Sequence, residues 1–484
     1  MAEFTVAGAK AAAPHAASAR KARVLETPEF ETPDFGTPEF ETPEFDTPEF
    51  ETEVLIAGGG MVGLTLGIAL AGVGIATIVV DAADPAALRA AAYDGRSSAI
   101  ARGTQQALAA LGIWPGMAAA AEPILEIRVS DGKVGSQASP FFLHYNHLEL
   151  SPDWQGPLGY IVENLATRRA LAAQAAGMAN LTLLAPARIA TLERGPAAAR
   201  AILDDGRRIQ ARLAVGAEGR ASPLREAAGI RATRWDYPQC GIVCTVAHEA
   251  PHAGVAHEHF LPSGPFALLP MTDLPEDAPG DAPGDAPQDA PEEAGPWGRH
   301  RSSLVWTERR ALVPALMALS EADFGAELER RFGTGLGRLR QVGGRWSYPL
   351  GLMFAERCVD ARLALVGDAA HVIHPIAGQG LNLGLRDVAA LAETLVDARR
   401  LGLDLGSAAV LARYQGWRRV DGALLAVATD GLNRLFSNDF GPLRLIRDLG
   451  LAAVDRAPPV KRFFMRHAMG LVGDLPRLVR GQAL

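Results

Sequence analysis

Three glycines at the end of an apolar run have the spacing of a phosphate-binding turn. Gly58, Gly60 and Gly63 follow residues 53–57 and open a stretch with a helical pattern. In such a unit the first glycine permits a tight turn, the second lets the backbone approach a pyrophosphate, and the third lets helix and strand pack closely. The helix start offers unpaired N–H groups to the phosphates. A second apolar run ends at Asp81, whose carboxylate is expected to accept hydrogen bonds from ribose hydroxyls. This order predicts a dinucleotide-binding unit rather than a glycine-rich turn of the core.

A second strand–acid–glycine element lies about 300 residues further along the chain. Residues 364–387, ALVGDAAHVIHPIAGQGLNLGLRD, place an apolar run before Gly367 and Asp368, and two histidines, a proline and more glycines after them. His371 and His374 lack a carboxylate or cysteine partner at metal-ligand spacing. We therefore predict no metal site and expect both histidines to pack as polar groups beside the loop.

The second element resembles the second flavin-binding motif of the para-hydroxybenzoate-hydroxylase-like flavoprotein monooxygenases. The resemblance implies that Asp368, directly after Gly367, binds the ribityl chain, and that Pro375 lies near the flavin edge where oxygen adds. It also implies that backbone N–H groups face the pyrimidine side of the flavin at Gly378, Gly380, Leu381 and Asn382. Two distant glycine loops would then hold opposite ends of one FAD, which a protein that binds only NAD would not require. Pro375, Gly378 and Gly380 are the candidate catalytic positions, acting through the backbone, and no acid–base residue is assigned.

Three further stretches are similar to the same family. GRSSAIARGTQQALAALGIW resembles its early arginine-containing loop, which makes Arg96 a candidate for binding the flavin phosphates. VENLATRRAL resembles the helix whose leading amide, here Asn164, lies near the flavin. LAVGAEGRASPLR resembles the middle motif that contacts FAD and the nicotinamide donor, with Gly219 and Arg225 matching. Glu218 departs from the aspartate usual in that motif, and its longer side chain shifts the carboxylate.

The branch that the chain resembles most is the one that contains the ubiquinone-biosynthesis hydroxylases, on YIVEN, HFLPSGPFALLPM and WSYPLGL. The resemblance covers roughly residues 53–470. It implies hydroxylation of the aromatic ring of a polyprenylated phenol: NADPH or NADH reduces FAD, dioxygen adds to give a flavin C4a-hydroperoxide, and its distal oxygen goes to the ring. Two alternatives stay open. One is a related flavoprotein oxidoreductase acting on another aromatic or isoprenoid substrate. The other is a non-catalytic flavin-binding assembly subunit, for which Glu218 is the only sequence hint.

The pattern of strands and helices expected around these loops, together with the family resemblance, predicts an α/β fold. We expect a Rossmann-like (GR2-type) FAD-binding domain, an inserted mixed β-sheet substrate domain and a C-terminal helical region. The uncharged segment 54–80 is interrupted by glycines, so strand–helix–strand is favoured over a membrane-spanning helix. Proline-rich acidic repeats, TPEF near the N-terminus and DAP further on, cannot build a core and are expected to be disordered. The predicted parts are a disordered leader (1–52), a discontinuous FAD-binding domain (53–125, 155–230 and 355–400), a substrate domain (126–154 and 231–354, with a disordered loop at 272–298) and the helical region (401–484).

The composition indicates the class of protein and the cellular compartment. The 484 residues are 48% hydrophobic and carry a net charge of −8, which fits a globular protein and argues against nucleic-acid binding. Three cysteines rule out a disulfide framework and fit the cytoplasm, with Cys240 and Cys244 expected as core thiols. His257 and His259 alternate on a predicted strand and face either a substrate cavity or water.

The C-terminal segment has a charge balance opposite to that of the whole chain. Residues 441–484 contain eight basic and three acidic residues, with apolar residues between them at roughly helical spacing. Two interpretations remain: peripheral contact with anionic lipid at the inner face of the cytoplasmic membrane, or helices that pack on the flavin domain with a solvated basic face. The family resemblance also implies a polyprenylated phenol and O2 as partners, a ubiquinone-biosynthesis protein complex and a homo-oligomer.

Overall fold

The structure, a computed structural model, describes residues 48–84, 95–135, 142–273, 299–375, 378–419 and 452–484, with the single positions 431, 435 and 450. The acidic repeats up to residue 47 and the DAP repeats between 274 and 298 lie outside the described residues. The architecture below is that of the unit that begins at Pro48. This unit is mixed α/β, which confirms the expected fold class.

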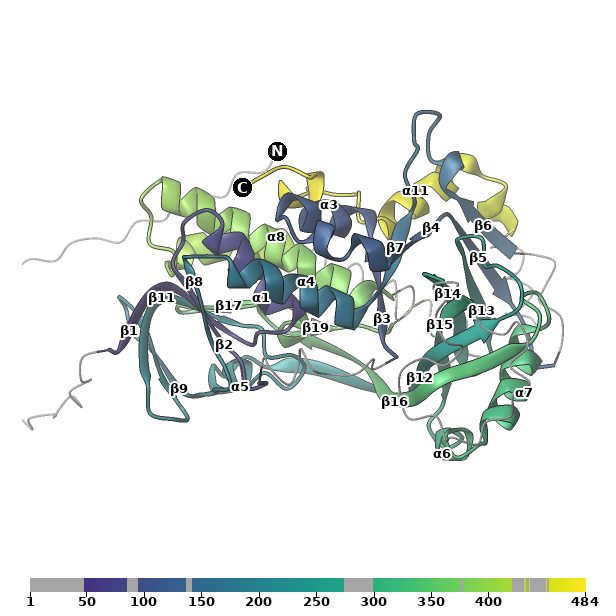
Figure 1. Ribbon diagram of the computed structural model, residues 1–484. Helices are drawn as coiled ribbons and strands as arrows, with labels where there is room; N and C mark the ends of the chain where they lie inside the picture. The colour runs from purple at the N-terminus through teal and green to yellow at the C-terminus, as the bar shows by residue number, and fades with distance from the viewer. Residues whose placement is uncertain are drawn as a thin grey trace, which may run out of the picture. The chain divides into compact units, whose positions relative to one another are not determined.

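The first glycine loop belongs to an eight-stranded sheet with a parallel centre. Strands β18, β11, β1, β2 and β8 are neighbours in that order and pair in parallel. The apolar runs VLIA of β1 and TIVV of β2 are buried, as expected for covered parallel strands. Helices α1, α4 and α8 lie over one face of the sheet (Figure 1). The bounds are β1 Phe50–Ala57, β2 Thr77–Val80, β8 Leu181–Leu184, β9 Ile189–Arg194, β10 Ala199–Leu203, β11 Arg208–Gly216, β17 Val359–Asp360, β18 Leu363–Leu365, α1 Met61–Ala71, α4 Asn164–Ala176 and α8 Gln379–Arg400.

Strand β1 begins earlier than the predicted boundary of the leader at residue 52. Phe50, Glu51 and Thr52 continue the parallel ladder by pairing with residues 209–211 of β11. Strand β11 is nine residues long and offers these extra partners, and Phe50 also packs against a buried apolar cluster. The ordered fold therefore includes the last residues assigned to the leader.

The glycine-interrupted segment 54–80 forms strand, helix and strand, as predicted. It contributes β1, α1 and β2, and most of α1 is buried against neighbouring elements. Among the described residues, no helix has both the length and the apolar character needed to cross a membrane.

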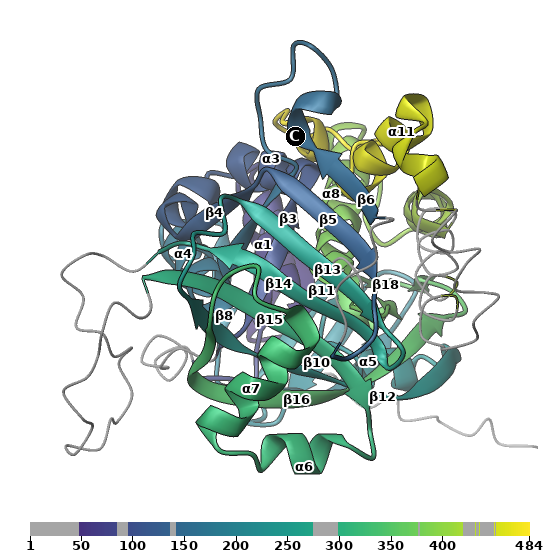
Figure 2. The ribbon, with the colours of Figure 1, turned by 90° about the vertical axis from the view of Figure 1, so that its right-hand side faces the viewer.

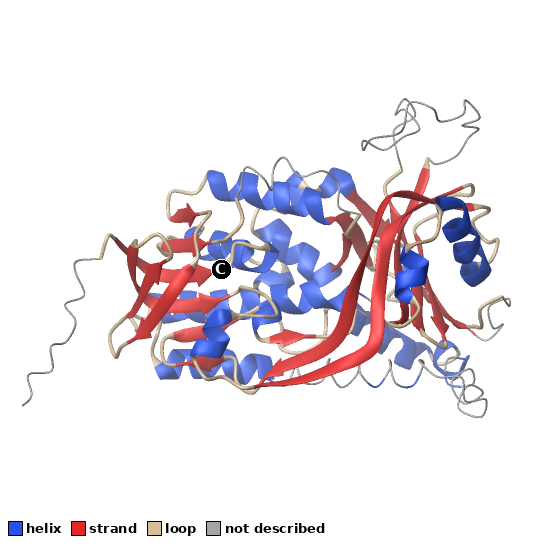
Figure 3. Cartoon of the chain, turned by 90° about the horizontal axis from the view of Figure 1, so that it is seen from below, coloured by secondary structure: helices blue, strands red, loops and turns tan. Residues whose placement is uncertain are grey.

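A second eight-stranded sheet forms the predicted mixed β-region. Its strand order is β19-β16-β12-β15-β14-β13-β5-β6, antiparallel except where β13 pairs with β5. The two 17-residue strands β12 and β16 run from this sheet toward the first one (Figure 3). Helices α6 and α7 lie against one face (Figure 2). The bounds are β5 Glu126–Asp131, β6 Phe142–Asn146, β12 Ala232–His248, β13 Val255–Leu261, β14 Gly264–Met271, β15 His300–Arg309, β16 Leu339–Ala355, β19 His371–Val372, α6 Val313–Met317 and α7 Glu321–Phe332.

A small third sheet was not predicted; its strands fall within segments assigned to the FAD-binding domain. Strand β7 (Gly159–Glu163) pairs on one side with β3 (Ser97–Ala101) and on the other with β4 (Ala121–Ile124). The short helices of the described chain are α3 Arg102–Ala110, α5 Pro223–Ala227 and the 3₁₀ turns η1 Trp114–Gly116, η2 Ala118–Ala120, η3 His147–Glu149, η4 Gly367–Ala369 and η6 Leu478–Arg480.

The described part of the C-terminal region is helical and packs on the protein. Residues 408–419 are helical, and α11 spans Pro458–Ala468. Met465 and Met469 are buried in an apolar cluster with residues of β4, β7, β13 and β14. Lys461, counted among the basic residues of the tail, is buried and pairs with Glu149 and Asp455. Packing on the chain, one of the two interpretations of this segment, is therefore observed for one face of α11.

Candidate active site

The first glycine loop has the sterics of a close strand–helix junction. Gly58 has a φ of +100°, and a Cβ there would lie 2.4 Å from the carbonyl oxygen of Ala217. A Cβ on Gly63 would lie 1.9 Å from the carbonyl oxygen of Gly58. Both distances are far below van der Waals contact, so any side chain at either position would force the helix off the strand.

Gly60 differs from these two glycines because its missing side chain leaves open space. A Cβ at this position would meet no atom within 4 Å, and the residue lies on the wall of a cavity. Asp81 holds the loop on the side away from the cavity: its carboxylate accepts hydrogen bonds from the backbone N–H groups of Gly59 and Ala83. The loop is thus hydrogen-bonded on that side, and open space lies on the side of the cavity.

The second glycine loop, residues 367–382, lies against the first. Gly367 has a φ of +61°, and a Cβ there would lie 3.2 Å from Val62 at the start of α1. A Cβ on Gly384, one turn into α8, would lie 3.0 Å from the same valine. The expected convergence of the two loops in space is therefore confirmed.

The side chain of Asn382 joins the second loop to strand β3. Its Oδ1 accepts a hydrogen bond of 2.9 Å from the N–H of Ala101, and its Nδ2 donates to the carbonyl of Ala99 at 2.8 Å. Gly378, which begins α8 in a left-handed conformation, packs close to the same strand, with a virtual Cβ 2.8 Å from that of Ala99. The amide therefore positions the loop, while Gly378, Gly380 and Leu381 remain on the cavity wall.

A buried network of charged side chains beneath the second loop was not predicted from the sequence. The carboxylate of Asp387 accepts hydrogen bonds from the N–H of Gly367 at 2.9 Å, from His371 at 2.6 Å and from Arg418 at 2.6 Å. Burial alone would raise the pKa of Asp387, but the charges and hydrogen bonds of His371 and Arg418 outweigh it and lower this pKa to about 2. His371 is thus a polar group packed beside the loop, as expected, and His374 is fully buried against the ring of Tyr237.

Arg96 and Asn164 enter the cavity from neighbouring turns. The N–H of Asn164 donates to the carbonyl of Arg96 at 3.0 Å, and the Asn164 side chain accepts from Ser98 at 2.6 Å. The guanidinium of Arg96 lies 5.9 Å from the ring centroid of Tyr348, which also lines the cavity. The hydroxyl of Ser97, also on the wall, is buried without a hydrogen-bond partner among the described residues.

The middle motif divides its residues between the cavity and the protein interior. Gly219 and Arg220 line the cavity. Glu218 turns away: its carboxylate accepts hydrogen bonds from Ser222 at 2.6 Å and from the N–H of Leu224 at 3.1 Å, at the start of α5. Burial raises the pKa of Glu218. The carboxylate of Glu218 therefore binds the start of a short helix and does not lie on the cavity wall.

Arg225 lies behind the cavity wall instead of on it. Its side chain is buried, and its guanidinium donates to the carbonyl of Ala369 at 2.9 Å and to that of Arg220 at 3.0 Å. These two carbonyls belong to the second glycine loop and the middle motif. Arg225 therefore braces both segments, while Arg220 lines the cavity.

One cavity of about 640 Å³ brings the predicted residues together. Of the predicted site residues, those on its wall are Gly60, Arg96, Asn164, Gly219, Asp368, Pro375, Gly378, Gly380, Leu381 and Asn382. Those that support the wall without lining it are Gly58, Gly63, Asp81, Arg225 and Gly367. Burial raises the pKa of Asp368 above its ordinary value, and the nearby charges of His371 and Arg220 offset this only in part.

The apolar lining of the cavity was not anticipated. Part of it is a face of the second sheet, with Val243, Val305 and Leu269. Another part is Met465 of α11 and Met469 directly after this helix. The spacing of the apolar residues in FFMRHAMGLV indicated a helix with an apolar face, but a single sequence does not show which surface such a helix covers.

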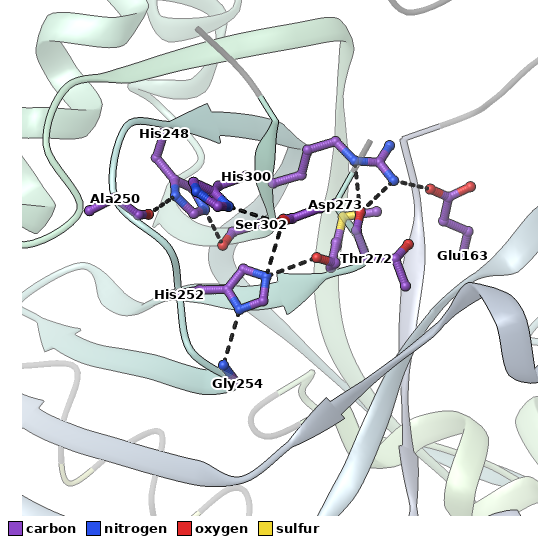
Figure 4. A network of polar contacts seen from close by, with 11 residues as sticks. Glu163, His248, Ala250, His252, Gly254, Thr272, Asp273, His300 and Ser302 are labelled. Carbon is purple, nitrogen blue, oxygen red and sulfur yellow. Dashed lines mark hydrogen bonds and ion pairs between the residues drawn. The ribbon is translucent and has the colours of Figure 1, made fainter. Parts of the chain in front are cut away.

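A polar network fastens the second sheet to β7 beside this cavity (Figure 4). Arg301 of β15 donates to the carbonyl of Thr272 at 2.8 Å and lies 3.4 Å from Glu163, the residue before Asn164. Deeper in the network, His248 contacts Ser302 at 3.0 Å, and burial lowers the pKa of this histidine to about 4. His248 is therefore neutral near pH 7, and the network fixes the sheet without adding charge to the cavity.

Comparison with known proteins identifies the family. The FAD binding domain family matches residues 51–419. The chain belongs to this family. It is 52% identical over 435 residues to ubiquinone hydroxylase UbiL of Rhodospirillum rubrum, covering 89% of this chain and 93% of that protein. It is 34% identical over 422 residues to 3-demethoxyubiquinol 3-hydroxylase of Escherichia coli, covering 87% and 99%. It therefore falls in the ubiquinone-biosynthesis hydroxylase branch of the FAD-dependent monooxygenases.

A solved structure shares the fold of these monooxygenases. The crystal structure of p-nitrophenol 4-monooxygenase PnpA from Pseudomonas putida matches with a TM-score of 0.68, covering 88% of this chain and 99% of that one at 16% identity. This likeness supports the fold alone.

The cavity fits FAD, the cofactor of the family. Gly60, Gly219 and Gly380 all face open space in which a Cβ would meet no atom within 4 Å, so backbone is exposed where a cofactor would lie. The buried Ser97 hydroxyl on the same wall has capacity for a further hydrogen bond. Residues from both glycine loops lie on this one wall, as a cofactor with two ends requires.

Proposed function

We propose that this protein is an FAD-dependent monooxygenase that hydroxylates the aromatic ring of a polyprenylated phenol in ubiquinone biosynthesis. The observation that carries the proposal is that one cavity is lined both by residues of the two glycine loops and by an apolar sheet face together with α11. A polar cofactor and a substrate with a ring and an isoprenoid tail match these two kinds of lining. The identity to named ubiquinone hydroxylases supports the same substrate class.

The residues of the chain have distinct tasks in this proposal. The redox chemistry, hydride acceptance from NADPH or NADH and activation of dioxygen, is supplied by FAD when it is bound. The backbone of Gly60 would approach the pyrophosphate, Asp368 the ribityl hydroxyls, and the start of α8 the flavin ring. The apolar walls around Val243, Val305 and Met465 would exclude water from the site, which suppresses side reactions of activated oxygen.

The test combines genetics with a product assay. A strain that lacks the gene should accumulate a quinone precursor short of one ring hydroxyl, and the purified holoenzyme should insert one labelled oxygen atom from dioxygen into a prenylated phenol. Under anaerobic conditions the phenol should accelerate the bleaching of the flavin by NADPH. A normal quinone profile in the deleted strain, together with no labelled product, would refute the proposal.

The non-catalytic alternative has Glu218 as its only hint in the sequence. The carboxylate of Glu218 binds the start of α5, and Gly219 and Arg220 line the cavity. Assembly with other ubiquinone-biosynthesis proteins and self-association remain predictions from the family resemblance.

Contact with a lipid surface is the second part of the proposal, with the protein at the cytoplasmic face of the membrane. Val460, Phe463 and Phe464 of α11 are 44%, 53% and 45% exposed, although the other side of the helix lines the cavity. Arg462 and Arg466 flank these apolar groups. An apolar ridge beside basic residues suits anionic lipid headgroups, and it would place the apolar end of the cavity near the bilayer that holds the substrate.

We expect Phe463→Asp combined with Phe464→Asp to lower binding to phosphatidylglycerol vesicles about tenfold or more, because two large apolar side chains no longer enter the interface. Co-sedimentation of the full-length holoenzyme measures this. The matched control is Leu401→Asp, which changes a side chain that is 74% exposed at the end of α8. Equal vesicle binding by the double variant and the control would contradict lipid contact through α11.

A further inference from the structure

Strand β15 places a hydroxyl group on the part of the cavity wall that the second sheet forms. Thr307 lines the cavity, and its side chain is fully buried. Its hydroxyl has no hydrogen-bond partner within the described part of the chain. An unpaired buried hydroxyl costs free energy, and each such group in a native protein calls for an explanation. Thr307 belongs to none of the motifs that bind the cofactor, which makes it a candidate for contact with the substrate.

The alternation of side chains along β15 directs Thr307 toward the cavity. Val305, two residues earlier, also lines the cavity. Leu304 and Trp306 instead belong to the apolar cluster that includes Phe324 of α7. Because successive side chains of a strand point to opposite faces of the sheet, Thr307 shares the face of Val305.

The neighbours of Thr307 on the adjacent strands are glycines. Its cross-strand partner on β12 is Gly241. Its methyl group lies beside Gly264 of β14, where an added Cβ would be 2.5 Å from that methyl carbon. Neither glycine has a side chain that could pair with the hydroxyl. A hydroxyl in this position suits a ligand that brings its own oxygen atom.

The register of the second sheet shows which part of the cavity Thr307 belongs to. Gly241 pairs with Tyr348 of β16 as well as with Thr307, so the three residues form one row across the sheet. All three line the cavity. The guanidinium of Arg96, a candidate for binding the flavin phosphates, lies 5.9 Å from the ring centroid of Tyr348. The row that contains Thr307 therefore meets the loop of Arg96.

Another row of the same sheet leads to α11. Ser303, four residues before Thr307 on β15, pairs with Leu269 of β14, and both line the cavity. Leu269 packs against the apolar cluster that contains Met465 and Met469. Four residues of a strand span roughly 13 Å. The sheet therefore offers a hydroxyl in the row that meets the arginine loop and an apolar surface some way along the strands, beside α11.

We infer that the hydroxyl of Thr307 binds the ring oxygen of the substrate, with the prenyl tail lying over Val305 and Leu269 toward α11. A threonine hydroxyl both donates and accepts, so it pairs equally with a phenol or with a ring methoxy group. The contact holds the ring in the row that contains Tyr348 and makes the enzyme select an oxygenated ring over a plain one. This inference rests on the proposed function and names the group that orients its substrate.

The test compares two probes that differ by one oxygen atom, ortho-farnesylphenol and farnesylbenzene, on the purified holoenzyme. Binding is followed by the change in the flavin spectrum. The wild type should bind the phenol about 3- to 10-fold more tightly than the hydrocarbon, as expected for one neutral hydrogen bond. Thr307→Val, which nearly keeps the shape of the side chain and removes its hydroxyl, should bring this ratio to one or below. Thr307→Ser, which keeps the hydroxyl, should keep most of the ratio.

A second readout separates a binding role from a structural one. In the substrate-free holoenzyme Thr307→Val removes an unpaired buried hydroxyl, so thermal unfolding should occur about 1–3 °C higher than in the wild type. A hydroxyl that stabilises the sheet itself would instead make this variant unfold at a lower temperature than the wild type. That result would overturn the inference.

The controls separate recognition from folding. Thr233→Val, at an exposed threonine of β12 outside the cavity lining, is the matched substitution and should keep the wild-type ratio. Ser303→Ala removes a hydroxyl from the row that leads to α11 and should also keep this ratio. An unchanged ratio in Thr307→Val would overturn the inference while leaving the proposed function intact, provided that the wild type hydroxylates the phenol. A wild type that binds FAD but hydroxylates neither probe would overturn both.

Discussion

Gly380→Leu is expected to yield a folded protein that binds FAD roughly 10- to 100-fold more weakly than the wild type. Gly380 lies in the first turn of α8, where leucine favours the helix more than glycine does. A Cβ at this position meets no protein atom within 4 Å and would enter the cavity, so the larger side chain competes with the flavin for space. Overpacking of this kind typically costs about 1–3 kcal/mol, which corresponds to the expected change in affinity.

The matched control is Gly416→Leu. Gly416 is also helical, is exposed, and would also place its Cβ in open space, but it does not line the cavity. Flavin absorbance after gel filtration and titration of the apoprotein with FAD measure both variants, with circular dichroism as the check on folding. Full FAD retention by Gly380→Leu would show that α8 does not begin at the flavin.

Asp387→Ala should lower the free energy of unfolding by about 3–5 kcal/mol, because it leaves the buried guanidinium of Arg418 without its carboxylate. It also removes the acceptor for the N–H of Gly367, so the second glycine loop should bind FAD less tightly. Urea denaturation of the apoprotein separates the first effect from the second. Asp397→Ala, which removes the partly exposed ion pairs with Arg413 and Arg477 further along α8, is the control and should cost about 1 kcal/mol or less. Equal losses in the two variants would contradict a buried network.

The same carboxylate makes a defined part of the stability depend on pH. The pKa of Asp387 is lowered from 3.8 to about 2 in the folded protein, so its contribution is fully present above pH 3.8. This contribution decreases as the pH falls from 3.8 toward about 2, where the folded protein also takes up the proton. Acid titration of the wild type and Asp387→Ala should therefore show curves that converge over this interval. Parallel curves would contradict the assigned charge state.

The two glycine loops could be predicted from the sequence because each requires particular residues at a fixed spacing. Gly58 and Gly63 allow no side chain, and the apolar runs before them allow only buried strands. The convergence of the loops followed from the resemblance to a family with one extended cofactor. The branch assignment agrees with the named relatives.

The elements that sequence reasoning missed depend on contacts between distant segments. In the sequence, Asp387 looks like an acidic residue on the surface of a helix. Its contacts with Arg418 and His371 are formed only in the fold. His257, one of two histidines expected to face either a substrate cavity or water, lies on the cavity wall. The basic tail suggested membrane contact, but its charge pattern does not show that Met465 lines the cavity.

Helix α11 has a consequence for synthesis on the ribosome. The first glycine loop leaves the exit tunnel early, the second follows about 300 residues later, and the helix that walls off the apolar end follows only near residue 468. A nascent chain that has not yet reached residue 468 lacks this wall, so the cavity is complete only after α11 has been made.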